Sequence, residues 1–162
     1  MLVTLNSIIK RQKRHGFAVF CDIDLSKNNR KGRIEWTFVA KRLKGLVGYG
    51  ITTFTNKLPV DMKNRGKFNE NIIMVRNDSS YINGGKSDKM QRSSIQWKMG
   101  DKITCYFDQR KGLFSMRKNG EPEVTIEKEV SSVKKIYPFV LFFDRFSDRT
   151  EAAKGDEIEF NC

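Results

Sequence analysis

Few residues in this sequence have a type and spacing that could support catalysis. The only histidine, His15, lies in the basic segment RQKRHG, with no Ser, Cys or carboxylate at a spacing typical of a nucleophile and its base. Asp22 and Asp24 are two residues apart in an extended stretch, so they share one face of a strand, but nothing around them suggests acid–base chemistry. We therefore expect that the protein is not an enzyme.

The sequence also lacks the patterns typical of metal, nucleotide or disulfide sites. Its three cysteines, Cys21, Cys105 and Cys162, are far apart, and the absence of a C-x-x-C pair argues against zinc and against a disulfide framework. The tripeptide GKS at 85–87 has neither the preceding glycine spacing nor the following helix of a phosphate-binding loop. We expect free thiols, no metal and no cofactor.

Short runs of alternating apolar residues, separated by turn residues, indicate strands. They occupy residues 16–25, 33–41, 45–54, 71–77, 79–85, 103–107, 114–116, 135–143 and 155–162. The short connection RLKG, residues 42–45, predicts that 33–41 and 45–54 pair as a central hairpin. Residues 55–70 have no sustained period and predict a long surface loop, and no segment has a convincing helical period. This pattern favours an all-β fold, a two-layer antiparallel β-sandwich.

The segment 100–120 is the clearest hairpin. Ile103, Cys105 and Phe107 would point to one side of an extended backbone and the residues between them to the other, so we expect a half-buried strand. Residues 108–112 supply the turn to a second strand, which ends at an Asn-Gly pair suited to a tight reversal. The segment is therefore expected to form a hairpin that leads into another turn.

The order of these motifs resembles that of the SPRY domain, a concanavalin-like β-sandwich of jelly-roll topology. The matching segments are VGYGI (47–51), SYINGG (80–85), WKMGDKITCYFDQRKGLFSMRKNGE (97–121), IYPFVLFF (136–143) and GDEIEF (155–160). Their joint order is the specific signal, since each is common alone. We expect one domain over 1–162, with a recognisable core at 33–161 and a basic N-terminal strand and loop region at 1–32.

The resemblance implies a non-catalytic protein-interaction module, an adaptor that binds a peptide or protein surface through edge loops of the sandwich. Aromatic and arginine side chains are the usual anchors of such surfaces. The resemblance therefore directs attention to the segments after VGYGITT, at SYINGG and after YPFVLFF. The expected partner-binding residues are Tyr81, Phe143, Asp144, Arg145 and Phe146, with Lys57, Lys63 and Arg65 at the rim.

The charge of the chain is uneven. The formal net charge is +12, and residues 1–65 hold 14 Lys and Arg against 4 Asp and Glu, whereas residues 66–162 hold 17 against 15. The alternative function is therefore a basic structural subunit of a ribonucleoprotein or filament assembly, which contacts nucleic acid or an acidic surface through residues 10–44. The basic patch would consist of Lys10, Arg11, Lys13, Arg14, Arg30, Lys31, Arg33, Lys41, Arg42 and Lys44.

No apolar run approaches the length that spans a bilayer, so we expect no membrane insertion. An intracellular and cytoplasmic location is the first expectation. A mitochondrial location is the alternative, because residues 1–21 contain basic residues and no Asp or Glu. The sequence leaves the partner and the oligomeric state open.

Overall fold

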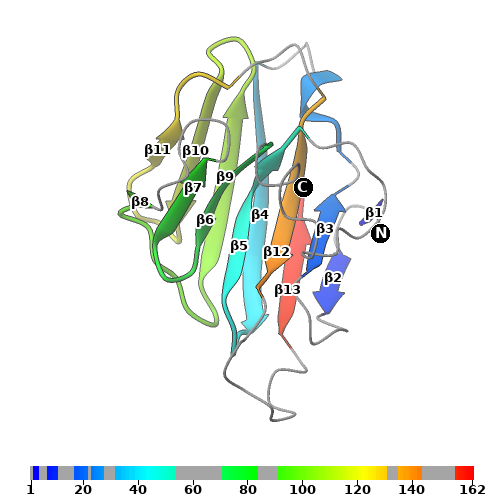
Figure 1. The fold of residues 1–162 in the computed structure, drawn as a ribbon, viewed down its shortest axis with the longest axis vertical. Coiled ribbons are helices and arrows are strands. Elements are labelled where there is room, and N and C mark those ends of the chain that lie inside the picture. The colour runs from blue at the N-terminus through cyan, green and yellow to red at the C-terminus, as the bar shows by residue number, and fades with distance from the viewer. Residues whose placement is uncertain are drawn as a thin grey trace.

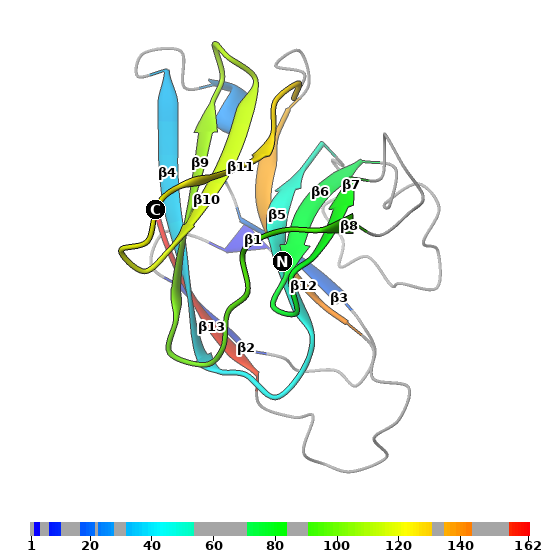
Figure 2. The same cartoon turned by 90° about the vertical axis from the view of Figure 1, so that its left-hand side faces the viewer.

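The computed structural model describes residues 2–3, 7–10, 17–21, 23–27, 32–53, 71–83, 91–130, 135–143 and 156–162. These residues form two β-sheets packed face to face (Figure 1), and the view turned by 90° shows β4, β9 and β10 on one side and β5, β6 and β7 on the other (Figure 2). The predicted two-layer β-sandwich is confirmed.

The first sheet has seven strands, in the order β1-β3-β12-β5-β6-β7-β8. Its strands are β1 (Leu2–Val3), β3 (Phe17–Cys21), β12 (Tyr137–Phe142), β5 (Val47–Thr52), β6 (Ile72–Arg76), β7 (Ser80–Asn83) and β8 (Gln91–Arg92). The parallel pairing of β1 with β3 is the exception, since all other pairs in the described part of the chain are antiparallel. The short β8 lies in a polar stretch where the sequence indicated no strand.

The second sheet has six antiparallel strands, in the order β11-β10-β9-β4-β13-β2. Its strands are β11 (Val124–Glu127), β10 (Leu113–Lys118), β9 (Lys102–Asp108), β4 (Arg33–Arg42), β13 (Glu157–Asn161) and β2 (Ser7–Lys10). A single-turn 3₁₀ helix, η1 (Leu25–Lys27), follows β3, so the chain leaves the first sheet before Leu25, which the alternation had placed in the strand.

The main core lies between the two sheets and is filled by aromatic rings. Phe38 of β4 stacks on Tyr49 of β5 with ring centroids 4.5 Å apart, and Tyr49 stacks on Trp97 at 4.6 Å. The ring centroids of Phe160 of β13 and Phe38 are 5.3 Å apart. This group of rings therefore includes residues of both sheets and Trp97, which lies before β9 in the chain. Offset-stacked rings of this kind add to the stabilisation that comes from burial alone.

The predicted pairing of 33–41 with 45–54 is wrong. β4 lies in the six-stranded sheet and β5 in the seven-stranded sheet, so the short connection carries the chain from one layer to the other. The two strands face each other through Phe38 and Tyr49 instead of sharing backbone hydrogen bonds. A short loop shows only that two strands are near each other, and each strand here has an apolar face that is buried by the opposite layer.

The hairpin of β9 and β10 is confirmed, because Phe107 is in register with Phe114 and Cys105 with Met116. The expected half-burial of β9 is wrong, however, since Tyr106 on the outer face is only 5% exposed. The guanidinium carbon of Arg33 lies 4.0 Å from the centre of the Tyr106 ring and covers it. Long charged side chains from neighbouring strands can thus bury an aromatic ring on a polar sheet face.

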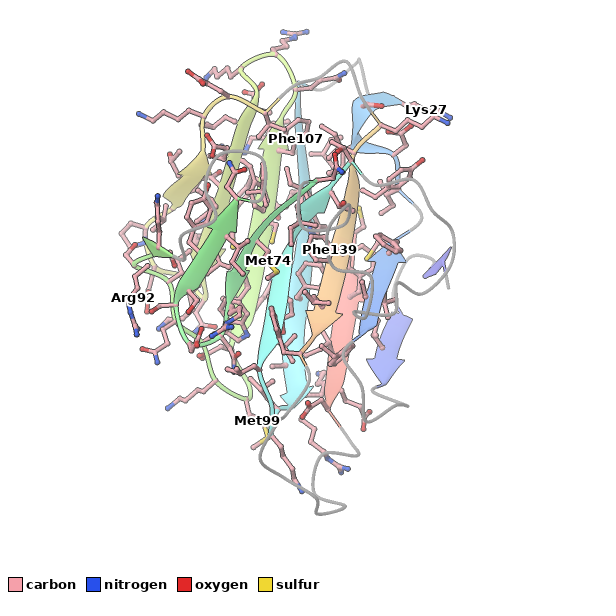
Figure 3. The ribbon with its side chains drawn as sticks, viewed as in Figure 1. Lys27, Met74, Arg92, Met99, Phe107 and Phe139 are labelled. Atoms are coloured by element: carbon pink, nitrogen blue, oxygen red, sulfur yellow. The ribbon has the colours of Figure 1, made fainter. Side chains whose placement is uncertain are left out.

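A second apolar cluster lies on the face of the seven-stranded sheet that is turned away from the six-stranded sheet. It consists of Ala18, Phe20, Ile72, Met74, Phe139 and Leu141, all at most 5% exposed, with Ile82 and Phe143 partly buried against it. Met74 and Phe139 mark this cluster near the centre of the sheet (Figure 3). The seven-stranded sheet is therefore apolar on both faces.

Candidate functional site

One end of the seven-stranded sheet is held together by Asn77. At this end β5 begins and both β6 and β12 end. The Asn77 side chain accepts a hydrogen bond from the Val47 N–H at 3.0 Å and donates one to the Gly45 carbonyl at 3.1 Å. The Phe143 N–H donates to the Leu46 carbonyl at 3.0 Å. These bonds fix the three strand ends relative to one another.

Phe143 and Arg76 form the centre of this end. The guanidinium carbon of Arg76 lies 4.9 Å from the centre of the Phe143 ring, within the range of a cation–π contact. The same guanidinium donates to both carboxylate oxygens of Asp78, from Nε to Oδ1 at 3.1 Å and from Nη2 to Oδ2. The flat face of the Arg76 guanidinium thus contacts Phe143, and its N–H groups are bonded to Asp78. The Arg76 side chain is therefore already ordered, and a partner that binds it removes little conformational entropy.

Asp78 is strongly acidic because of this contact. The pKa of Asp78 is lowered to about 2, first by the hydrogen bond from Arg76 and also by the Ser80 N–H, which donates to Oδ1 at 3.1 Å, while burial acts in the opposite direction. The turn between β6 and β7 also places Ser79 at a φ of 70°, a conformation that is uncommon outside glycine. The turn is therefore ordered by charge and by backbone geometry together.

Asp78→Asn is expected to lower thermal stability at neutral pH and to have a smaller effect as the pH falls. The folded pKa of about 2 lies below the ordinary value of 3.8, so the ionised carboxylate stabilises the fold above pH 3.8, and this contribution is lost as the pH falls through 2. Asp78 is 37% exposed, so solvent screens the contact and the effect is small. Melting temperatures of both proteins across this pH range test the prediction. Glu121→Gln, which also neutralises a carboxylate, is the matched control. A difference in melting temperature between Asp78→Asn and the wild type that does not change with pH would contradict the prediction.

Tyr81 of β7 joins the edges of the two sheets. Its hydroxyl donates to Oε2 of Glu127 on β11 at 2.8 Å, and the Asn83 side chain donates to the same oxygen at 2.6 Å. Burial, and then the bond to Glu127, raise the pKa of Tyr81 to about 12. Tyr81 packs against the core between the sheets, so this arrangement closes one side of the sandwich.

Comparison with solved structures places this architecture among known folds. The SPRY domain of human HERC1 is similar with a TM-score of 0.69 at 17% identity, covering 95% of this chain and 87% of that one. The PSpry domain of TRIM65 is similar with a TM-score of 0.54 at 13% identity, covering 90% and 70%. The chain has the fold of a SPRY domain. Stonustoxin is also similar, with a TM-score of 0.57 at 19% identity, over 88% of this chain and 20% of the toxin chain.

No protein-family profile matches the sequence. No curated protein matches it either. The SPRY fold is therefore visible in the arrangement of the strands and in the order of a few turn motifs. At identities below one in five, the likeness establishes the fold alone.

Two of the predicted partner-binding residues lie in the described part of this SPRY-like sandwich, and the structure does not bring them together. Tyr81 contacts the core between the sheets, whereas Phe143 contacts the apolar cluster on the opposite face of the same sheet. The other predicted residues fall outside the described residues: Asp144, Arg145, Phe146, Lys57, Lys63 and Arg65.

The chain enters 54–70 and 144–146 from opposite ends of the seven-stranded sheet. Thr52, at the end of β5, is in register with Tyr137, at the start of β12, while Phe142 is in register with Val47. The strand ends that lead into the two segments are therefore at opposite ends of the sheet. The groove predicted from both segments stays a prediction.

Four members of the predicted basic patch have described side chains. Arg33 pairs with Glu123 at 2.5 Å and Lys41 with Glu159 at 2.8 Å. Arg33 and Lys41 lie near opposite ends of β4. Arg42, the last residue of β4, and Lys44, in the connection that follows, are exposed. Lys10 lies in β2, and the remaining members lie outside the described residues: Arg11, Lys13, Arg14, Arg30 and Lys31. The described members do not form one continuous unpaired patch.

The residues that resemble catalytic or metal-binding groups have structural roles where they are described. Asp24 accepts hydrogen bonds from the Ser26 N–H at 3.0 Å and the Ser26 hydroxyl at 2.5 Å, which orders η1. Burial raises the pKa of the Cys21 and Cys105 thiols, so both favour the unreactive protonated form. No group of three or more His, Cys, Asp or Glu placed to hold a metal occurs in the described ranges. No helix within them is long and apolar enough to cross a membrane.

The sequence analysis missed Arg76, Asn77 and Asp78. All three belong to the segment RNDSS (76–80), which runs from the last residue of β6 to the first residue of β7, and an Asn-Asp pair between two strands indicates a turn. The turn itself could have been predicted from these residue types. The contact of Arg76 with Phe143 could not, because it joins strands that are distant in the chain.

Proposed function

We propose that this protein is a non-catalytic protein-interaction module that binds a peptide or protein surface at the end of the seven-stranded sheet where Phe143 and Arg76 lie. The observation that carries the proposal is the partly buried Phe143 ring under the Arg76 guanidinium, on strand ends fixed by Asn77. An aromatic ring and an arginine that are already ordered can bind a partner at a low entropic cost.

The SPRY fold supports the same proposal. The resemblance implies an interaction module in which the loop after the YPFVLFF strand contributes to the binding surface, and in this chain that loop begins directly after Phe143. We therefore include Asp144, Arg145 and Phe146 in the proposed surface. Lys57, Lys63 and Arg65 are proposed as rim residues that approach this surface along the sheet, since the chain leaves β5 for 54–70 at the opposite end. Tyr81 is assigned to the join between the sheets.

The alternative is a basic structural subunit that contacts nucleic acid or an acidic filament through residues 10–44. The excess of Lys and Arg in residues 1–65 supports it. The ion pairs of Arg33 and Lys41 weigh against it, because a residue already paired with a carboxylate gains less from a phosphate.

Replacing Arg145 and Phe146 together by alanine is expected to abolish the capture of a specific protein partner from cell extract while thermal stability stays unchanged. The physical reason is the loss of the charged and aromatic anchors that follow Phe143 in the chain. Affinity capture followed by crosslinking mass spectrometry measures this. Lys111→Glu is the control, since Lys111 is 75% exposed in the turn between β9 and β10, at the end of the six-stranded sheet away from the β4–β5 connection.

A capture profile that is the same for the double variant and for the wild-type protein would remove the proposed surface. Capture that disappears on nuclease treatment, and falls steeply with added salt, would instead support the basic-subunit alternative. Capture experiments on one set of cell extracts therefore distinguish the two proposed functions.

A further inference from the structure

The outer face of the seven-stranded sheet is apolar and closed to solvent. The six residues of its cluster come from β3, β12 and β6, and none is more than 5% exposed. On β5 between them, a Cβ on Gly48 would lie 2.7 Å from the Met74 sulfur, so Met74 lies over this glycine. An antiparallel sheet that packs one face on a core commonly leaves its other face to water. The burial of this outer face therefore requires a cover.

The apolar side chains that the structure describes do not provide this cover. Ile82 and Phe143 pack against the cluster, but Ile82 belongs to β7 and Phe143 follows the last residue of β12. β7 lies beyond β6, whereas Phe20 lies on β3 at the other side of the sheet (Figure 1). Ile82 and Phe143 therefore flank the cluster at one side and at one end, which leaves the cover to residues outside the described ranges.

Among those residues, the segment 54–70 has the most apolar side chains. The segment 144–155 has one large apolar residue, Phe146, and 84–90 has one, Met90, whereas 11–16 has none. The large apolar residues of 54–70 are Phe54, Leu58, Val60, Met62 and Phe68. This segment is therefore the best supplied to bury an apolar sheet face.

Both ends of this segment are fixed beside the cluster. The Thr53 N–H donates to the Asn71 carbonyl at 3.1 Å, and the Thr53 hydroxyl donates to the Asn71 Oδ1 at 3.1 Å. Ile72, which follows, is a member of the cluster, and it is in register with Thr52 of β5. The chain thus leaves β5 and enters β6 at the edge of the face that needs a cover.

The segment is also long enough. From Ile72 to the level of Leu141 the cluster extends four residues along the strands, about 13 Å, and from β6 to β3 it extends three strand spacings, about 14 Å. A chain of 17 residues that doubles back on itself can reach about 26 Å from its ends. Residues that begin and end beside Ile72 can therefore cross the whole cluster.

We propose that residues 54–70 lie across the outer face of the seven-stranded sheet and bury its apolar cluster under Leu58, Val60 and Met62. These three residues occupy every second position, so in an extended chain their side chains share one side. Removal of apolar surface from water supplies the driving force. The outer face is then part of the interior and is not free for a partner. The inference stands without the proposed function, because it concerns burial within one chain.

Oxidation by hydrogen peroxide, followed by peptide mass spectrometry, tests this inference. The peroxide transfers one oxygen atom to a thioether sulfur and leaves as water, so it must reach the sulfur. Met99 is 59% exposed, Met116 is fully buried between the sheets, and Met74 is 1% exposed on the outer face. In the wild-type protein, Met99 is expected to be oxidised fast, and Met74 and Met116 slowly.

Replacement of 54–70 by a Gly-Ser segment of the same length is expected to speed the oxidation of Met74 by about tenfold or more, while Met116 stays protected. Phe146→Ser is the control for the segment 144–155 and is expected to leave Met74 protected. Unchanged protection of Met74 in the Gly-Ser variant would overturn the inference. Exposure of Met74 by Phe146→Ser would also overturn it, and so would wild-type protection that falls on dilution, which would assign the cover to a second copy of the chain.

The milder pair Leu58→Ser with Val60→Ser keeps the test decisive if the Gly-Ser variant unfolds. In that pair Met74 is expected to be oxidised faster than in the wild type, and Met116 is expected to stay protected. Loss of a cover on the outer face must expose Met74 before the core between the sheets opens. Equal rises at Met74 and Met116 in both variants, or no rise at Met74 in the pair, would therefore end the inference.

Discussion

Gly50→Ala is expected to lower the free energy of unfolding by about 3 kcal/mol, because a methyl group has no space at this position. A Cβ on Gly50 would meet the Ile73 carbonyl oxygen, and it would lie 2.7 Å from the Met74 Cβ and 2.8 Å from the Met74 Cα. These neighbours belong to β6, which is paired with β5 through backbone hydrogen bonds. The clash can be relieved only by moving two central strands apart.

Urea denaturation of the purified protein measures this loss. Gly120→Ala is the matched control, since no atom lies within 4 Å of a Cβ at that position, and we expect a change within about 0.5 kcal/mol there. If Gly50→Ala lowered the free energy of unfolding as little as Gly120→Ala, the prediction that β5 packs too closely against β6 for a methyl group would be wrong.

Phe38→Ala is expected to cost about 3 to 5 kcal/mol of folding free energy, the range typical of aromatic truncation in a core. Phe38 is fully buried and its ring contacts Tyr49 at 4.5 Å and Phe160 at 5.3 Å. Alanine would leave a cavity between the two sheets and remove both ring contacts. Since a domain of this size is stable by only about 5 to 15 kcal/mol, the variant is expected to lose a large share of its stability.

Phe38→Leu separates the loss of volume from the loss of aromatic contacts. Leucine fills much of the same space, so we expect a cost of about 1.5 kcal/mol. Denaturation curves of the two variants give the comparison. Equal costs for alanine and leucine would show that packing volume at Phe38 is not what holds the layers together.

The hairpin of β9 and β10 could be predicted from the sequence because its determinants are local. The alternation of Ile103, Cys105 and Phe107 defines the buried face. Asn119 takes a φ of 49°, which asparagine tolerates better than most residues, and its side chain accepts a bond from the Lys102 N–H. The exposure of Tyr106 was predicted wrongly because Arg33 and Arg117, which lie over its ring, come from the neighbouring strands. Alternation predicts the direction of a side chain and not what covers it.

The partner-binding residues expected from the resemblance stay a prediction. Phe143 was expected from the resemblance, and it lies at an ordered end of the sheet. Its contact with Arg76 depends on the spatial order of β12, β5 and β6, which local patterns do not contain. Tyr81 was expected in the same binding groove as Phe143, and its hydroxyl donates to Glu127 of the other sheet.

The sequence by itself determined that the chain forms strands, where most of them begin and end, and which turns need asparagine or glycine, because these properties depend on residues close together in the chain. Only the tertiary structure decided that β4 and β5 face each other across the core, and that Arg76 covers Phe143. The physical reason is that a strand's apolar face can be buried by any other apolar face, so the choice among them depends on the packing of the whole chain.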